Sequence, residues 1–175
     1  VAVWGCSSSD SSGGAGGSGG GGTGGSGGSD FAWPPDATVY FDQYGVFHGD
    51  CATDEDCAMA LGYFHARDRF VQMDLQRRLS TGRLTGVVNK AVVESAANRA
   101  LYSTRDGRPA EEFMLEHTNA RTLRVLEAYA VGVNQWIDDV QNGENGATWP
   151  AEFGSPVLDY GPEDALDWAP TDTFA

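Results

Sequence analysis

The sequence has few basic residues, since 11 Lys and Arg stand against 25 Asp and Glu, for a formal net charge of −14. Nucleic-acid binding needs a basic stripe that displaces phosphate counterions, and this chain has none. The same deficit excludes electrostatic attachment to anionic lipid. The chain also has no run of about 18 apolar residues, so no segment is predicted to span a bilayer. These absences exclude nucleic acid as a partner and leave a covalent lipid as the predicted route to a membrane.

Residues 7–30 lack large apolar side chains and consist almost entirely of Gly and Ser. Such a stretch has nothing to bury and behaves as a flexible coil, so we interpret it as a disordered tether. Residues 31–175 have the composition of one globular domain with a sizeable core.

Residues 1–6, VAVWGC, form a short apolar piece that ends in Gly-Cys just before the tether. This is similar to the end of a bacterial lipoprotein signal, in which the Cys becomes the lipidated residue. On this interpretation Cys6 carries the lipid, and the protein is exported and either anchored at the cell envelope or periplasmic. The alternative is an ordinary apolar N-terminus with a chance Cys.

Cys51 and Cys57 remain once Cys6 is assigned to lipid. In an exported protein an even pair can oxidise, and the five-residue spacing crosses a predicted turn into a helix, so a small disulfide loop is feasible. Two free, buried thiols are the alternative. A zinc site is not predicted, because no further ligand lies nearby.

A strand or short hairpin is predicted over residues 38–47, where apolar and polar residues alternate around Tyr44-Gly45. A long helix follows, with a capping start at Thr53 and Asp56 and a stop at Gly82. Its predicted apolar stripe is Cys57, Leu61, Phe64, Asp68, Val71 and Leu75.

Asp68 lies in the middle of that stripe, so we expect its carboxylate to meet a fixed donor inside the protein. We therefore predict that Asp68 and Arg69 make structural ion pairs that hold the helix against its neighbours. Asp74 and Arg78 form a further i,i+4 pair, which is worth little where it is exposed.

A second long helix is predicted from about Glu111 to Val140, ended by Asn142-Gly143. Between the two helices, an apolar patch at 87–93 and a weak helix at 96–102 are predicted.

No motif in the chain predicts an active site. The three histidines have no metal-binding spacing, no G-x-S-x-G occurs in residues 31–175, and no Ser has a local partner that would activate its hydroxyl. The residues themselves therefore predict no catalytic residue, no metal ligand and no cofactor, and leave the substrate-binding residues unknown.

The order of three motifs does indicate a family. GY-x2-A-x-DR-x2-QM at 62–73, AYA-x-GVN at 128–134 and WAPTD at 168–172 resemble the α-chain region of penicillin acylases, which include acyl-homoserine-lactone and cephalosporin acylases. The resemblance covers 38–172. It implies an α+β fold, namely the mostly helical α-chain portion of an N-terminal-nucleophile αββα sandwich, with an N-terminal strand or hairpin. Residues 31–175 would then be part of such a domain.

The resemblance also implies a zymogen that cuts itself and exposes a Ser at the start of a β-chain. That Ser would use its own α-amino group as base and hydrolyse the linear amide of an N-acyl substrate, of the β-lactam or acyl-homoserine-lactone type, in antibiotic metabolism. The β-chain would be this chain's partner. Calcium is possible in a full-length family member, but none is assigned to residues here. The chain alone is expected to be an inactive fragment.

A non-catalytic, surface-tethered helical binding module is the alternative function. It predicts that residues 30–175 fold cooperatively alone, whereas the enzyme hypothesis predicts loose packing without a partner chain.

Overall fold

The computed structural model describes residues 33–84, 99, 101, 106–154 and 160–175. Cys6, the tether, the apolar patch and most of the weak helix therefore lie outside the described residues. The described elements are, in chain order, β1 (Ala37–Phe41), β2 (Phe47–Cys51), α1 (Asp54–Ser80), α3 (Ala110–Glu116), α4 (Ala120–Asn142) and the 3-10 helices η2 (Ala151–Gly154), η3 (Pro162–Asp164) and η4 (Pro170–Phe174).

The N-terminal hairpin pairs β1 with β2 in antiparallel register along their whole length. The Asp42 carboxylate shapes the turn, because its Oδ1 accepts hydrogen bonds from the N–H groups of Tyr44 (2.8 Å) and Val46 (2.9 Å). Gly45 supplies the left-handed backbone with φ +76°. The hairpin predicted over 38–47 is confirmed. Its second strand, β2, continues beyond the predicted end to Cys51.

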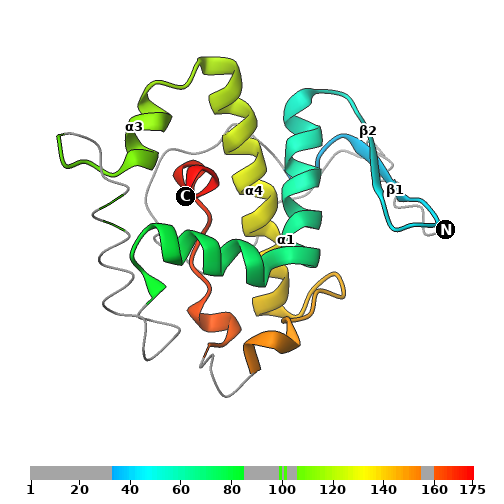
Figure 1. Cartoon of the computed structure of the whole chain (residues 1–175). Helices are drawn as coiled ribbons and strands as arrows, with labels where there is room; N and C mark the ends of the chain where they lie inside the picture. The colour runs from blue at the N-terminus through cyan, green and yellow to red at the C-terminus, as the bar shows by residue number, and fades with distance from the viewer. Residues whose placement is uncertain (1–32, 85–98, 100, 102–105, 155–159) are drawn as a thin grey trace, which may run out of the picture.

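Helix α1 is confirmed close to its predicted bounds. The Thr53 hydroxyl oxygen accepts a hydrogen bond from the Asp56 N–H (3.1 Å), which satisfies one of the free donors at the helix start. At the other end Gly82 adopts φ +73°, as a helix-terminating glycine does. Figure 1 shows that α1 changes direction sharply about half-way, so that its two halves meet different neighbours.

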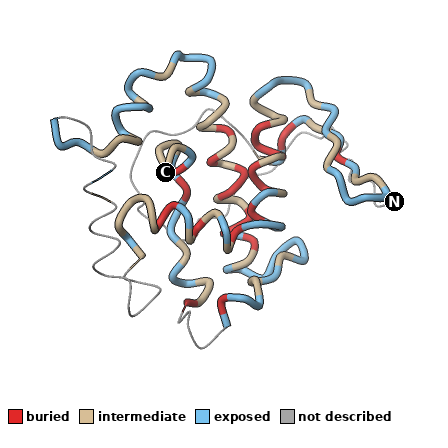
Figure 2. Tube along the Cα trace, viewed as in Figure 1, coloured by how far each residue is buried: buried red, intermediate tan, exposed pale blue. Residues whose placement is uncertain are grey.

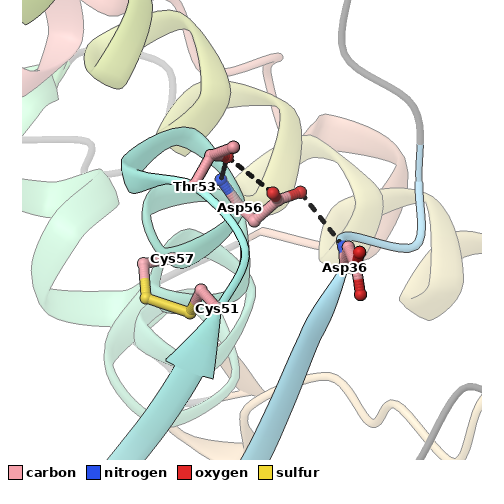
Figure 3. Close-up of a disulfide and its surroundings, with 5 residues drawn as sticks. All are labelled: Asp36, Cys51, Thr53, Asp56 and Cys57. Atoms are coloured by element: carbon pink, nitrogen blue, oxygen red, sulfur yellow. Dashed lines mark hydrogen bonds between the residues drawn. A yellow bond between two sulfur atoms is a disulfide. The ribbon is translucent and has the colours of Figure 1, made fainter.

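A disulfide joins the end of β2 to the first turns of α1 (Figure 3). The Cα atoms of Cys51 and Cys57 lie 5.5 Å apart, a normal separation for this bond. Beside it, the Asp56 carboxylate accepts hydrogen bonds from the Asp36 N–H (3.0 Å) and the Thr53 hydroxyl (2.5 Å). The hairpin is thus tied to the helix on both of its strands.

The prediction of one continuous second helix is wrong, because the structure divides this stretch into α3 and α4. The break occurs at Asn119, whose side-chain oxygen accepts a hydrogen bond from the Thr122 N–H (2.9 Å) and starts α4 afresh. A residue that caps a helix start favours a non-helical backbone of its own, and the apolar periodicity did not register this. The predicted stop is confirmed, with Gly143 at φ +70°.

The first half of α1 crosses α4 at two glycines. A Cβ on Gly62 would lie 2.2 Å from the Tyr129 carbonyl oxygen, and one on Gly132 would lie 1.9 Å from the Met59 carbonyl oxygen. The two backbones therefore touch, which only glycine allows. Figure 2 shows buried residues concentrated at this crossing.

The second half of α1 packs on an aromatic core with α4 and the C-terminal segment. Its buried members include Phe70, Trp136, Phe153, Tyr160 and Trp168. The predicted fold class is confirmed, since the described residues are mostly helical and carry one small N-terminal hairpin.

Candidate functional site

The main buried polar cluster lies on the second half of α1. Asp74 is 0% exposed and accepts hydrogen bonds from the Nε atoms of Arg77 (2.6 Å) and Arg78 (2.7 Å). Both guanidinium groups are also buried. One carboxylate thus contacts two cations away from water, where unpaired charges would cost several kcal/mol.

Arg77 connects α1 to the C-terminal segment. Its Nη2 donates to the Leu166 carbonyl oxygen (2.6 Å), and its Nη1 donates to the Asp167 carbonyl oxygen (3.0 Å) and to Asp172 Oδ2 (3.2 Å). The guanidinium carbon also lies 4.8 Å from the centre of the Trp168 ring.

Arg78 makes a parallel set of contacts. Its Nη2 donates to the Tyr160 hydroxyl (2.9 Å) and to the Asp164 carbonyl oxygen (3.2 Å), and its guanidinium carbon lies 4.8 Å from the centre of the Tyr160 ring. Burial raises the pKa of Tyr160, and the nearby Asp74 charge raises it further, so the phenol stays neutral.

We call Asp74, Arg77, Arg78, Tyr160 and Asp172 the Asp74 cluster. Its two carboxylates balance its two guanidinium groups, and the donors reach carbonyl oxygens that belong to no α-helix or strand. Arg83 adds a bond to Asp172 Oδ1 (2.8 Å) from the protein surface. This arrangement is suited to holding a backbone segment in place, because its polar atoms are already engaged with one another.

The predicted burial of Asp68 within this chain is wrong, whereas ion pairs of Asp68 and Arg69 with a β-chain stay a prediction. Asp68 is exposed and its carboxylate pairs with the adjacent Arg67, at 2.7 Å to Nε and 3.1 Å to Nη2. Arg69 is exposed and donates to Gln72 (3.4 Å). The buried face of α1 runs instead through Gly62, Tyr63, Ala66, Phe70 and Asp74, and Gly62 lies where this face crosses α4.

A second buried carboxylate, Asp139 of α4, organises the loop that follows. It accepts hydrogen bonds from the Tyr63 hydroxyl (2.7 Å), Gln135 Nε2 (2.9 Å) and Asn145 Nδ2 (2.9 Å). Burial raises the pKa of Tyr63, with Asp139 as a further cause. The bond to Asn145 holds the turn at Asn145-Gly146, where both residues have positive φ.

That turn forms one wall of a pocket of about 320 Å³. Its floor contains the buried side chains of Val39, Tyr63 and Trp136, and its rim contains Arg67 and residues 145–148. The pocket therefore has apolar, buried walls below and charged or polar groups at its opening.

The histidines of the described residues make no catalytic pair with a hydroxyl or thiol of Ser, Thr or Cys. His48 Nε2 lies 3.5 Å from Asp42 Oδ2, His65 Nδ1 lies 3.2 Å from the Tyr129 hydroxyl, and His117 Nδ1 contacts the Phe113 carbonyl oxygen.

Within the part of the chain that the structure describes, no three His, Cys, Asp or Glu side chains gather in a way that could hold a metal ion. None of the described helices is both long and apolar enough to cross a bilayer.

The sequence contains an indication of the Asp74 cluster. Asp74 precedes two arginines by three and four positions, which places all three on one helical face, and Asp172 belongs to the WAPTD motif. The link between them could not be seen, because Asp74 and Asp172 are far apart in the sequence.

Comparison with known proteins identifies the family. The family model described as Penicillin amidase matches residues 36–175, most of the chain. The chain belongs to the penicillin amidase family. The match includes α1, α4 and the C-terminal segment held by the Asp74 cluster.

Two curated relatives support this assignment. The chain is 33% identical over 123 residues to an acyl-homoserine lactone acylase, QuiP, of Pseudomonas aeruginosa, covering 65% of this chain and 13% of that protein. It is 30% identical over 130 residues to the penicillin acylase 2 proenzyme of Pseudomonas sp. strain SE83, covering 74% of this chain and 15% of that protein. The chain thus spans about one seventh of the length of these relatives.

The fold is also similar to that of a solved structure, the thermostable penicillin G acylase from Alcaligenes faecalis. The TM-score is 0.65 at 21% identity, and the match covers 80% of this chain and 69% of the solved chain. This likeness shows the fold alone.

Proposed function

We propose that this chain is the α-region of an amidohydrolase that cleaves the linear amide bond of an N-acyl substrate. The observation that carries the proposal is the family match over residues 36–175. The names of the two relatives indicate the substrate classes, since one is an acyl-homoserine lactone acylase and the other a penicillin acylase. The proposed substrates are therefore N-acyl compounds of the β-lactam or acyl-homoserine-lactone type, within antibiotic metabolism.

The nucleophile in this proposal is a Ser at the N-terminus of a β-chain cut from the same precursor. Its free α-amino group would take the hydroxyl proton as the hydroxyl oxygen attacks the amide carbonyl carbon, and the acyl-enzyme would then be hydrolysed by water. Support comes from the described residues, which offer no activated hydroxyl or thiol on a histidine. Residues 1–175 would accordingly be inactive alone.

The role proposed for this chain is to frame the β-chain. The Asp74 cluster holds residues 160–172 on α1, and Asp139 holds the loop after α4. The carboxylates of Asp74 and Asp139 are both engaged in hydrogen bonds within the chain. We therefore assign neither of them a step in the hydrolysis.

The test is to express the complete gene and measure amine release from penicillin G and from an N-acyl homoserine lactone. We expect two chains by intact mass, with a Ser at the second N-terminus, and free amine from at least one substrate. The control replaces that Ser with Ala, which should abolish amine release. A single uncut chain that releases no amine would reject the proposal and favour the binding module.

Attachment through lipid on Cys6, and export, form a second part of the proposal. The Cys51–Cys57 disulfide supports export, because such bonds persist in oxidising compartments. Incorporation of a labelled fatty acid should occur in the unmodified protein and not in Cys6→Ala. Equal labelling of the two proteins would remove the anchor.

A further inference from the structure

The pocket between β1, α1 and the loop after α4 has the chemistry of a ligand site. Its volume of about 320 Å³ lies in the range of small-molecule sites. The apolar floor and polar opening match a molecule with an apolar body and one polar end. Different elements supply the walls, so the described fold builds the pocket.

Arg67 is the charged group at this pocket, and its guanidinium is held in place. The guanidinium carbon lies 4.7 Å from the ring centres of both Phe41 and Phe64. Asp68 occupies the edge formed by Nε and Nη2. The edge that includes Nη1 has no partner among the described residues. A guanidinium has five N–H donors, so this second edge can bind another carboxylate through two hydrogen bonds.

The walls favour an aromatic body. The rings of Phe41 and Phe64 meet edge to face, with centres 5.2 Å apart at 77°, and those of Tyr63 and Phe64 do so at 5.5 Å and 80°. Aromatic side chains therefore line much of this pocket, and they are favourable neighbours for another aromatic ring.

We propose that this pocket binds a small aryl carboxylate, with its ring over the floor formed by Val39, Tyr63 and Trp136. Its carboxylate lies on the free edge of the Arg67 guanidinium. The assignment rests on the pocket and on Arg67, and it holds whether or not the protein hydrolyses amides.

The experiment is a titration of the complete protein with 3-phenylpropanoate and with the uncharged 3-phenyl-1-propanol, which has no amide bond to hydrolyse. Methyl resonances of Val39 and Ala147, which line the pocket, report on binding at this place. We expect the acid to bind about tenfold or more tightly than the alcohol, since charge-assisted hydrogen bonds are stronger than neutral ones. Equal affinities, or no shift of these methyl resonances with either compound, would overturn the proposal.

Arg67→Met should remove the preference for the acid, and Arg69→Met should leave it unchanged. Arg69 is a matched control, because it is an exposed arginine two positions away on α1 that does not line this pocket. Equal effects of the two substitutions would overturn the role of Arg67. If Arg67→Met fails to fold, Arg67→Lys retains the charge but not the two-donor edge, and it should weaken acid binding. Unchanged acid binding in Arg67→Lys would overturn the two-bond geometry.

Discussion

The two halves of α1 bury their inner faces in opposite ways. The first half crosses α4 with backbone against backbone at Gly62 and Gly132, and buries no charge there. The second half buries Asp74, Arg77 and Arg78. Both halves belong to one continuous helix of 27 residues.

The difference follows from what each half contacts. Helix α4 satisfies its own backbone groups, so the first half needs only small side chains to approach it. The segment around residues 164–167 contains carbonyl groups outside any α-helix or strand, and such groups need donors from elsewhere in the protein. Arg77 and Arg78 supply those donors, and Asp74 balances their charge. Buried charge on this helix therefore reflects the irregular backbone beside it.

The largest effect should come from Asp74→Ala, which leaves two buried guanidinium groups without their shared carboxylate. We expect a loss of about 3–5 kcal/mol in the free energy of unfolding, measured by urea denaturation of the complete protein. Asp68→Ala is the matched control on the same helix, and because the Asp68–Arg67 pair is exposed it should cost about 0–1 kcal/mol. Similar losses for both substitutions would remove the distinction between buried and exposed pairs.

Gly132→Ala should test the first half. In an open helix this change stabilises by about 1 kcal/mol, but here the new Cβ would meet a carbonyl oxygen at 1.9 Å. We expect a net loss of about 1–3 kcal/mol because the helices must separate. Gly154→Ala is the control, since a Cβ there has no neighbour within 4 Å. A stabilised Gly132→Ala protein would contradict the close crossing.

The disulfide ties the first half of α1 covalently to β2. Among the described residues, the second half has no such bond. Replacing Cys51 and Cys57 together with Ala should cost on the order of 2 kcal/mol, because the closed loop is short. Mass spectrometry after alkylation without reductant provides the direct check. Two alkylated thiols at these positions would show that the alternative of free cysteines is correct.

The smallest expected effect is the change of stability with pH that comes from His65, near the middle of α1. Partial burial lowers the pKa of His65 below its ordinary 6.5, and Asp68 acts in the opposite direction. Below about pH 6.5 the unfolded chain therefore binds the proton more readily, so stability should fall as the pH decreases. His65→Gln should reduce this slope between pH 7 and 5.

An NMR pH titration of His65 gives a sharper readout of Asp68. In Asp68→Asn the opposing charge is gone, so the pKa of His65 should decrease further. An unchanged pKa would mean that the Asp68 charge has no effect on His65.

The hairpin and the ends of α1 could be predicted because local signals decide them. Thr53 at the start of α1 and the glycines at positions 45, 82 and 143 act through their own backbone and nearest neighbours. The division between α3 and α4 was not predicted because the apolar periodicity does not register a helix start at Asn119, which only the bond from the Thr122 N–H to its side chain shows.

The burial of Asp74 rather than Asp68 could not be predicted, since both are acidic residues beside arginines on one helix. The choice depends on where α1 bends and on the carbonyl groups that its second half meets. The pocket beside Arg67 could likewise not be predicted from the sequence, because it combines residues from β1, α1 and the loop after α4.

The sequence by itself determined the acidic character of this protein, its family and the local starts and stops of its main elements. Those properties depend on composition and on neighbours within a few residues. Only the tertiary structure decided which charges are buried, which glycines touch another helix and where a pocket opens. Those properties depend on partners that are distant in the chain, such as Asp74 and Asp172, and the cost of burying a group is set by the partner that it meets.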